Sequence, residues 1–381
     1  MGGEVRCTAM ATFRSRLGLT LAAVAVALAA LTLWSSAPMA ARAPGFPAQL
    51  TDKEFWDLSE LISEPNGEFQ SDNFLSNERG YQVIIPDLLK TATAGRVYLG
   101  VGPEQNFPYI LALKPQIAII FDIRRGNLHE HLLYKSLFEM STDRADFLSR
   151  LFSRKRPDGL TTTSTTSEMM AAYDAVTPTD AMYQETLKAV SDRLTKTHGF
   201  ALHDTDLTGI DYVFRTAFYN GGPRLTYSMA GRTGGRGGGS MGTYAEIQAL
   251  TDGTGLNRGF LGSEANWLAM KDFETRNLLV PVVGDFAGPK AIRAVGKYLK
   301  EHDAVVSAFY LSNVEQYLNR AGTEDVFLCN VAQLPLDDTS TFIYTGAGRT
   351  GGGFGGGRGG GGGLNTTFLR PIKADTVGCA K

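Results

Sequence analysis

Residues 96–125 constrain the fold of this chain more strongly than any other stretch. Val97–Val101 is a short apolar run rich in strand-favouring residues, and Ile117–Phe121 is a second one, followed directly by Asp122. Continuous apolar runs of this length are typical of buried strands. Between them lie a turn and a short apolar segment, Tyr109–Leu113, that we expect to be helical. A strand, a turn, a helix and a second strand that ends on a carboxylate form the front of a nucleotide-binding βαβ unit.

The turn after the first run has the residue types of a ligand-binding loop. Gly100 and Gly102 let the backbone approach a ligand closely, and the following helix would offer free N–H groups at its N-terminus. Asp122 comes 20 residues after Gly102, where a carboxylate can accept the hydroxyls of a ribose. Gln105 replaces the third glycine of the dinucleotide fingerprint, and Glu104 would repel a pyrophosphate. We therefore expect a ligand without phosphates here, such as one that carries an ammonium or sulfonium group.

The motif GVGPEQN at 100–106, followed by IIFDIRR at 119–125, resembles motif I and the acidic position after strand 2 of class I S-adenosylmethionine (SAM) methyltransferases. Two further stretches, 63–78 and 280–318, extend the resemblance over most of residues 50–345, and the chain is similar to a bacterial family of unknown activity with that fold. The resemblance implies SAM as the cofactor. It implies that the cofactor-binding residues are Gly100, Gly102, Glu104, Asn106, Asp122, Asp285 and Phe286.

A third and a fourth strand are predicted near the C-terminal end of this region. Leu279–Val283 precedes Asp285, which the resemblance places at the adenine amino group, although Asp285 could also face another part of the pocket. The run 304–310 leads to a polar segment, and in class I methyltransferases such a segment lies near the transferred methyl group. The candidate catalytic residues are therefore Ser312, Asn313 and Glu315. Ser312 and Asn313 are equally ordinary N-caps for a helix over 314–318.

The polar segment 63–78 comes before the first strand. In methyltransferase-like folds the corresponding segment often folds over the cofactor, so its polar side chains are further candidates for the pocket wall. They are Asp72, Asn73, Asn77 and Glu78. A surface loop with helix caps is an equally good interpretation of the same residues.

These patterns predict an α/β fold, with a doubly wound, mostly parallel methyltransferase-like sheet and a helical insertion between strands 2 and 3. Later strands are expected at 326–331, which includes Cys329, at 341–344, and at 367–372 on an edge. The predicted units are a signal peptide or anchor (1–43), the first half of the Rossmann-like domain (44–140), the insertion with a glycine-rich loop at 231–242 (141–278), the second half (279–345), and a glycine-rich segment with a tail (346–381).

The first 43 residues have the pattern of a secretory signal: Arg14 and Arg16, the uncharged run 17–34, then small residues. The run has 18 residues, so it could also remain as a membrane anchor. In either case we expect the body of the protein outside the cytoplasm. Without this segment 33 basic and 38 acidic residues remain, a net charge of −5 that does not favour nucleic acid as a partner.

Two glycine-rich segments and two cysteines complete the sequence features. Residues 231–242 contain seven glycines and residues 346–363 contain thirteen, so neither segment can pack a core. Cys329 and Cys379 could pair in an oxidising compartment. The simpler interpretation, which we favour at this point, is a buried Cys329 in a strand and an unpaired Cys379 in the tail.

Two functions fit the sequence. The first is a SAM-binding protein, which could be a methyltransferase of unknown acceptor. The lack of a sharp catalytic motif does not argue against this function, because methyl transfer depends mainly on proximity and orientation. The second is an exported binding or structural protein on a methyltransferase-like scaffold, because SAM is a cytoplasmic metabolite and fold does not imply function. In both, the partner is a small molecule. No metal is expected, since His129 and His131 do not share a helix face and Asp204 with Asp206 lacks further acids at ligand spacing.

Overall fold

The computed structural model describes residues 45–76, 78–227, 242–346 and 366–379. The expected signal segment 1–43, Asn77 and nearly all of the glycine-rich stretches 231–242 and 346–363 lie outside these ranges. The described residues from Phe46 onward form one compact unit. In the described part of the chain, no helix is both long enough and apolar enough to cross a bilayer.

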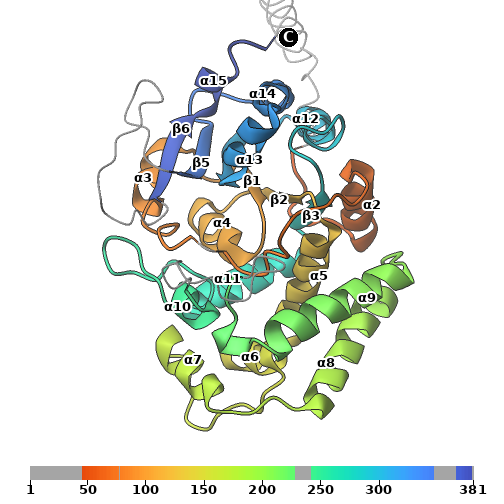
Figure 1. Ribbon diagram of the computed structural model, residues 1–381, viewed down its shortest axis with the longest axis vertical. Coiled ribbons are helices and arrows are strands. Elements are labelled where there is room, and N and C mark those ends of the chain that lie inside the picture. The colour runs from red at the N-terminus through yellow and green to blue at the C-terminus, as the bar shows by residue number, and fades with distance from the viewer. Residues whose placement is uncertain (1–44, 77, 228–241, 347–365, 380–381) are drawn as a thin grey trace, which may run out of the picture. The chain divides into compact units, whose positions relative to one another are not determined.

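A six-stranded sheet is the centre of this unit (Figure 1). Its strand order is β3-β2-β1-β4-β5-β6. The first five strands are parallel and β6 pairs antiparallel with β5 at the edge. The bounds are β1 Val97–Val101, β2 Ile117–Asp122, β3 Leu279–Val283, β4 Val306–Ser312, β5 Thr341–Gly346 and β6 Thr366–Pro371. The order 3-2-1-4-5 is that of the dinucleotide-binding folds, so the predicted doubly wound α/β fold is confirmed.

Two groups of helices cover the sheet (Figure 1). One contains α4 (Phe107–Leu113), α5 (Arg125–Met140) and α11 (Glu264–Thr275), which contact one another, and α5 also contacts β2 and β3. The other contains α2 (Asp52–Ile62), α12 (Ala291–Glu301), α13 (Val314–Ala321) and α14 (Glu324–Val331). Every residue of β1 and β2 is buried, as expected of parallel strands with helices on both faces.

The insertion between β2 and β3 is helical. After α5, the described residues contain α6 (Arg144–Phe152), α7 (Thr166–Asp174), α8 (Asp180–Asp192), α9 (Asp204–Val213), α10 (Tyr244–Gln248) and α11. Single turns or π-helical segments occur at Arg193–Thr197, Phe214–Tyr219 and Gly222–Arg224, and one isolated bridge joins Thr226 to Thr243. In Figure 1 helices α6 to α10 gather on the side of α5 away from the sheet. The remaining helices are α3 (Ile85–Thr91) and α15 (Ile372–Asp375).

One predicted strand was wrong. Residues 326–331 lie in α14, and Thr341–Gly346 is the fifth strand rather than the sixth. A short apolar run cannot be assigned to helix or strand from its hydrophobicity alone. The helical burial spacing decides it: Phe327, Asn330 and Val331 are buried, whereas Val326 is 44% exposed. Glu324 at the N-terminus of α14 also favours a helix there.

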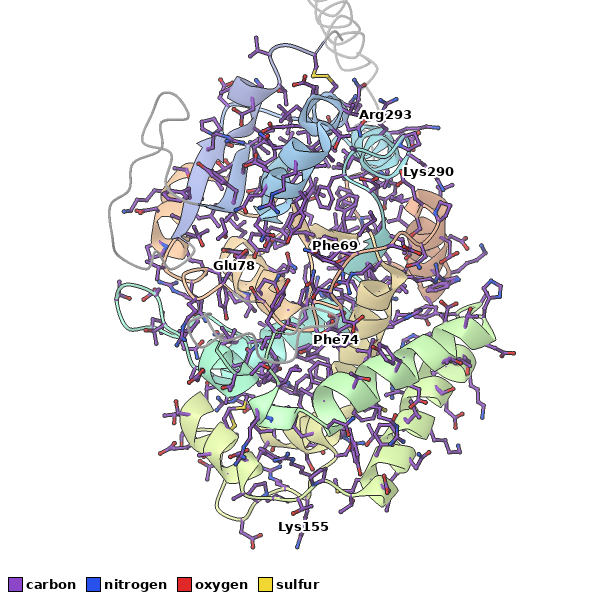
Figure 2. All side chains as sticks on the ribbon, viewed as in Figure 1. Phe69, Phe74, Glu78, Lys155, Lys290 and Arg293 are labelled. Atoms are coloured by element: carbon purple, nitrogen blue, oxygen red, sulfur yellow. A yellow bond between two sulfur atoms is a disulfide. The ribbon has the colours of Figure 1, made fainter. Side chains whose placement is uncertain are left out.

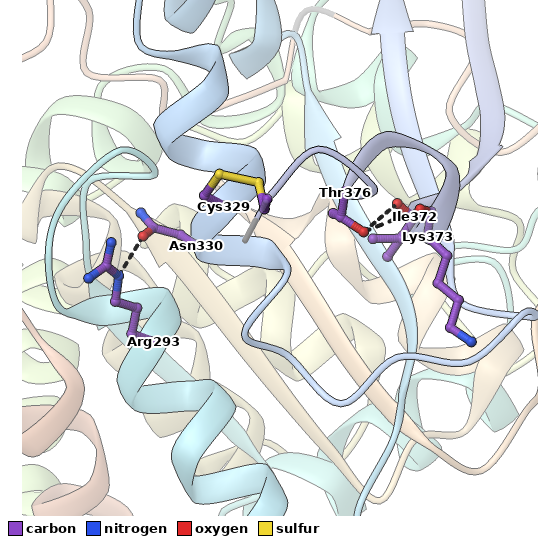
Figure 3. Close-up of a disulfide and its surroundings, with 7 residues drawn as sticks. Arg293, Cys329, Asn330, Ile372, Lys373 and Thr376 are labelled. Atoms are coloured by element: carbon purple, nitrogen blue, oxygen red, sulfur yellow. Dashed lines mark hydrogen bonds between the residues drawn. A yellow bond between two sulfur atoms is a disulfide. The ribbon is translucent and has the colours of Figure 1, made fainter. Parts of the chain in front are cut away.

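The cysteine interpretation was wrong as well. Cys329 lies in α14 and forms a disulfide with Cys379, which ties the C-terminal tail to that helix (Figure 3). The two cysteines are 50 residues apart in sequence. Their pairing could not be derived from the sequence, because it depends on β6 returning the chain alongside β5 and bringing the tail to α14.

Candidate functional site

A pocket of about 340 Å³ opens at the carboxyl ends of the parallel strands. Val101 and Gly102 line it from β1, Asp122 from β2, Asp285 and Phe286 from the segment after β3, and Ser312 with Asn313 from the end of β4. Ligands of open α/β sheets bind at this edge, where the strand order reverses. The volume lies within the range of small-molecule sites. Six predicted site residues therefore meet in one cavity: Gly102, Asp122, Asp285, Phe286, Ser312 and Asn313.

The backbone conformation of the loop after β1 is fixed by side chains of the loop itself. Gly102 has a φ of +80°, which L-residues rarely adopt, and a Cβ there would lie 2.9 Å from Gln105 Nε2. The Asn106 amide donates hydrogen bonds to the carbonyls of Val101, Gly102 and Pro103 at 3.0, 3.1 and 2.7 Å. These bonds fix the backbone of the loop beside the pocket.

Gly100 and Asn106 do not line the pocket, contrary to what the resemblance implied. Asn106 is fully buried, and its Oδ1 accepts a hydrogen bond from the Tyr98 hydroxyl at 2.9 Å. A Cβ on Gly100 would come within 2.0 Å of that same Oδ1. Gly100 is therefore needed to make room for the asparagine that shapes the loop, rather than for a ligand.

Glu104 is also absent from the pocket lining. It is 1% exposed, and its Oε1 accepts a hydrogen bond from Gln248 Nε2 at 3.0 Å, so it faces the helical insertion. Its Oε2 has no hydrogen-bond partner among the described residues. Burial raises the pKa of Glu104 to about 8, so it carries a proton at neutral pH. The expected repulsion of phosphate by Glu104 therefore has no structural basis.

Asp122 is held at the pocket wall by Arg124. Arg124 donates three hydrogen bonds to the carboxylate, from its backbone N at 2.8 Å, from Nε at 3.2 Å and from Nη2 at 3.1 Å. Arg124 Nη1 also donates to the carbonyl of Asp72, which binds the 63–78 segment to the end of β2. A carboxylate accepts about four hydrogen bonds, so Asp122 keeps room for about one more.

Asp285 and Phe286 form the next part of the wall. Asp285 is exposed, and its Oδ1 accepts a hydrogen bond from the backbone N of Ala287 at 2.9 Å. Phe286 is 6% exposed and stacks on Phe309 with ring centroids 5.9 Å apart. The sequence did not indicate the partner of this segment. Glu64 accepts hydrogen bonds from the backbone N of Asp285, Lys290 and Ala291 at 2.8 to 2.9 Å, so a carboxylate occupies the N-terminus of α12.

The end of β4 contributes Ser312 rather than Glu315. Ser312 lines the pocket and its hydroxyl donates a hydrogen bond to Glu78 Oε1. Asn313 is at the N-cap position of α13, as one interpretation expected, but its side chain makes no capping hydrogen bond, and Ser312 is not at the cap. Glu315 forms an ion pair with Arg370 of β6 and does not line the pocket.

The 63–78 segment forms part of the pocket wall. Phe69, Asn73, Leu75 and Ser76 line it, and Figure 2 shows Phe69, Phe74 and Glu78 in the centre of the view. Of the four polar candidates in this segment, Asn73 is in the lining, Asp72 binds Arg124 through its carbonyl, and Glu78 lies behind Ser312. The fourth, Asn77, lies outside the described residues.

Sequence reasoning missed the aromatic side of the pocket. Phe69 packs edge-on against Tyr317 of α13, with ring centroids 5.0 Å apart, and both line the cavity together with Tyr227 and Leu318. Tyr317 and Leu318 carry the apolar face of α13, a pattern that could have been found as helical periodicity over 314–321. Phe69 stands in a polar loop and gave no periodic pattern.

The described pocket lining contains acidic but no basic side chains, although Asp122 is paired with Arg124. It includes the carboxylates of Asp122 and Asp285 and no lysine, arginine or histidine side chain. The two histidines considered as metal ligands bind protein groups instead. His129 pairs with Asp206, and His131 Nε2 donates to the Gly102 carbonyl at 3.0 Å. Within the described ranges, no three His, Cys, Asp or Glu side chains are grouped to hold a metal ion.

Comparison with known proteins identifies a family without an assigned activity. The family described as "Domain of unknown function (DUF7790)" matches residues 73–204 and 243–354. The first segment contains β1, β2 and the loop between them, and the second contains β3, β4 and β5. No curated protein matches the chain. Because the two matched segments together cover more than half of the 381 residues, the chain belongs to the DUF7790 domain family.

Proposed function

We propose that the pocket binds SAM and that the protein is a SAM-dependent methyltransferase. One observation carries this proposal: residues predicted separately from four strand ends line a single cavity. They are Gly102 of motif I, Asp122 at the end of β2, Asp285 and Phe286 after β3, and Ser312 and Asn313 at the end of β4. The methyl acceptor is a small molecule whose identity the pocket does not specify.

The residues present suit SAM in chemical terms. Gly102 leaves a close approach that a side chain would block, and Asp122 has room to accept a ribose hydroxyl. Asp285 can accept hydrogen bonds from an adenine amino group beside the ring of Phe286. When bound, SAM would supply a sulfonium-activated methyl group, and the described lining has no basic side chain that would repel that positive charge.

The same wall disfavours phosphate-bearing cofactors. Helix N-termini are the usual phosphate sites of these folds, and Glu64 already occupies one of them, at α12. A dinucleotide would also lie against Asp122 and Asp285 without a basic side chain from the described lining. These features support a cationic nucleoside over NAD, and so a methyltransferase over an oxidoreductase.

Calorimetric titration of residues 44–381 with SAM, S-adenosylhomocysteine and NAD tests the proposal. We expect micromolar binding of the first two and none of NAD. Asp122→Asn keeps the shape and an acceptor for Arg124 but removes the charge, so it should weaken SAM binding about tenfold, or about 1.4 kcal/mol. Glu68→Gln, on an exposed side chain outside the lining, should change nothing. Absence of SAM binding by folded protein would contradict the proposal.

A second candidate function rests on the disulfide. Cys329 and Cys379 are paired, and disulfides persist in oxidising compartments outside the cytoplasm. An exported protein would have little access to SAM, and its pocket would then take another ligand that carries hydroxyl or amino groups. If the titration shows no SAM binding while the disulfide forms in the purified protein, this exported binding protein becomes the better hypothesis.

A further inference from the structure

Ser312 has a backbone conformation that a serine seldom adopts. It lies where β4 ends and α13 begins, with a φ of +51°, and the β4–β5 register is irregular between Tyr310 and Ser312. A non-glycine residue at positive φ costs of order 1–3 kcal/mol, and such residues cluster at functional sites. A sharp strand-to-helix turn at the carboxyl edge of a parallel sheet is where the nucleophilic serines of one large class of α/β enzymes lie.

The hydroxyl of Ser312 is directed at a buried carboxylate. It donates to Oε1 of Glu78, whose Oε2 accepts from the Tyr310 hydroxyl at 2.7 Å. Glu78 is 1% exposed, and the hydrogen bonds that act on it come from hydroxyl groups rather than from a described basic side chain. A carboxylate that accepts the proton of a serine hydroxyl is the arrangement in which a base activates a nucleophile.

The other side of Ser312 faces the pocket. Asn313 and Val314 line it beside Ser312, and α13 begins at Val314 without a side-chain cap. The first N–H groups of a helix have no partner within that helix and carry partial positive charge. They lie next to the serine, where a negative oxygen would develop during attack on a carbonyl. The nearby Phe69, Tyr317 and Leu318 provide an apolar surface for the group attached to that carbonyl.

We propose that Ser312 is a nucleophile that accepts the acyl group of an apolar carboxylic ester, with Glu78 as its general base. In this step the Ser312 oxygen forms a bond to the acyl carbon, and the Ser312 proton passes to Glu78. The ester C–O bond then breaks, and Glu78 returns the proton to the leaving alkoxide, which departs as an alcohol. The step needs no cofactor, so it does not depend on the SAM proposal.

An alkyl fluorophosphonate tests the proposal on the full-length protein. This probe forms a covalent bond to activated serines and releases fluoride, and the adduct is located by peptide mass spectrometry. We expect one adduct per chain, on Ser312, and none in Ser312→Ala. Glu78→Gln retains the size of the side chain but not the base, and should slow labelling about 100-fold. Ser167→Ala, at an exposed serine of α7, should label like the wild type.

The pH dependence of labelling separates a base from a structural hydrogen-bond partner. Burial raises the pKa of Glu78. Wild-type labelling should therefore fall as the pH decreases through this raised pKa, because Glu78 then carries a proton and cannot act as a base, and Glu78→Gln should show no such fall. The titratable groups nearest Glu78 are Tyr98, Tyr109 and Tyr310, whose pKa values burial also raises, so they stay neutral throughout the test.

Two results would overturn the proposal. One is a folded wild-type protein that takes no adduct, or that takes it at another residue. Another is Glu78→Gln labelled as fast as the wild type. Tyr310→Phe keeps Ser312 and Glu78 but removes a hydrogen bond that lowers the pKa of Glu78, so its labelling should begin to fall at a higher pH than in the wild type. An unshifted profile in folded Tyr310→Phe would contradict the role of Glu78, so the base is tested even if Glu78→Gln fails to fold. The mass readout is independent of SAM, so the two proposals can fail separately.

Discussion

Glu104 is buried as an acid rather than as a carboxylate, and this makes stability depend on pH. Its pKa is about 8 in the folded chain and 4.5 ordinarily. Between these values the native state holds a proton that the unfolded state releases, so stability falls as pH rises from about 4.5 to about 8. Glu104→Gln keeps an acceptor for Gln248 and removes this loss, which is at most about 1.4 kcal/mol per pH unit.

Urea unfolding at pH 5, 7 and 9 checks this prediction. We expect the wild type to lose more stability over the range than Glu104→Gln, although Glu130 and Glu274 are also buried with raised pKa values and keep part of the slope in both proteins. Glu68→Gln, at an exposed site, serves as the control. Parallel pH profiles for the wild type and Glu104→Gln would show that Glu104 is ionised in the folded chain.

At the scale of elements, Glu64 joins the segment after α2 to the start of α12. Its carboxylate accepts the backbone N–H groups of Lys290 and Ala291, both at 2.8 Å, where no side chain of α12 itself provides a cap. Glu64→Ala leaves these donors without an acceptor, so we expect a loss of about 1–2 kcal/mol of unfolding free energy. Glu64→Gln keeps an acceptor and should cost less. Glu68→Ala is the matched control, and equal stability of both alanine variants in urea would contradict the prediction.

At the scale of the whole unit, the C-terminal tail is held by a covalent bond. The tail turns through α15, where the Thr376 hydroxyl donates to the Ile372 and Lys373 carbonyls, and ends on Cys379 (Figure 3). Closing a loop of 50 residues restricts the unfolded chain and typically adds about 2–4 kcal/mol. Cys379→Ser in residues 44–381 should therefore lose about 2–4 kcal/mol of unfolding free energy and unfold at a lower urea concentration.

Thiol titration of denatured, unreduced protein provides the direct check on the disulfide. Residues 44–381 contain Cys329 and Cys379 and no third cysteine. We expect no free thiol before reduction and two after it. Two free thiols in protein purified from an oxidising compartment would contradict the pairing, and with it the support that the pairing lends to export.

The sequence predicted the elements whose pattern is local. The runs 97–101, 117–121 and 279–283 are strands, because an uninterrupted apolar run bounded by turns fits a strand buried on both faces. The strand predicted at 326–331 was wrong because a run of the same length also fits a helix whose buried residues are three and four apart. The tertiary contacts of Phe327 and Val331, both fully buried, decide that case.

The candidate site also has a part that local sequence patterns predicted and a part that they did not. Gly102, Asp122, Asp285 and Ser312 lie at or just after strand ends, and parallel strands bring their carboxyl ends to one edge, so the order of runs along the chain was enough to predict that these residues meet. It could not determine which way a side chain turns, or which distant group meets it. Three results came from the folded chain alone. Glu104 faces the insertion, Glu315 binds Arg370, and Glu64 and Glu78 reach α12 and Ser312 across more than 200 residues. The physical reason is that burial and long-range hydrogen bonds depend on how elements pack, and packing leaves no trace in local periodicity.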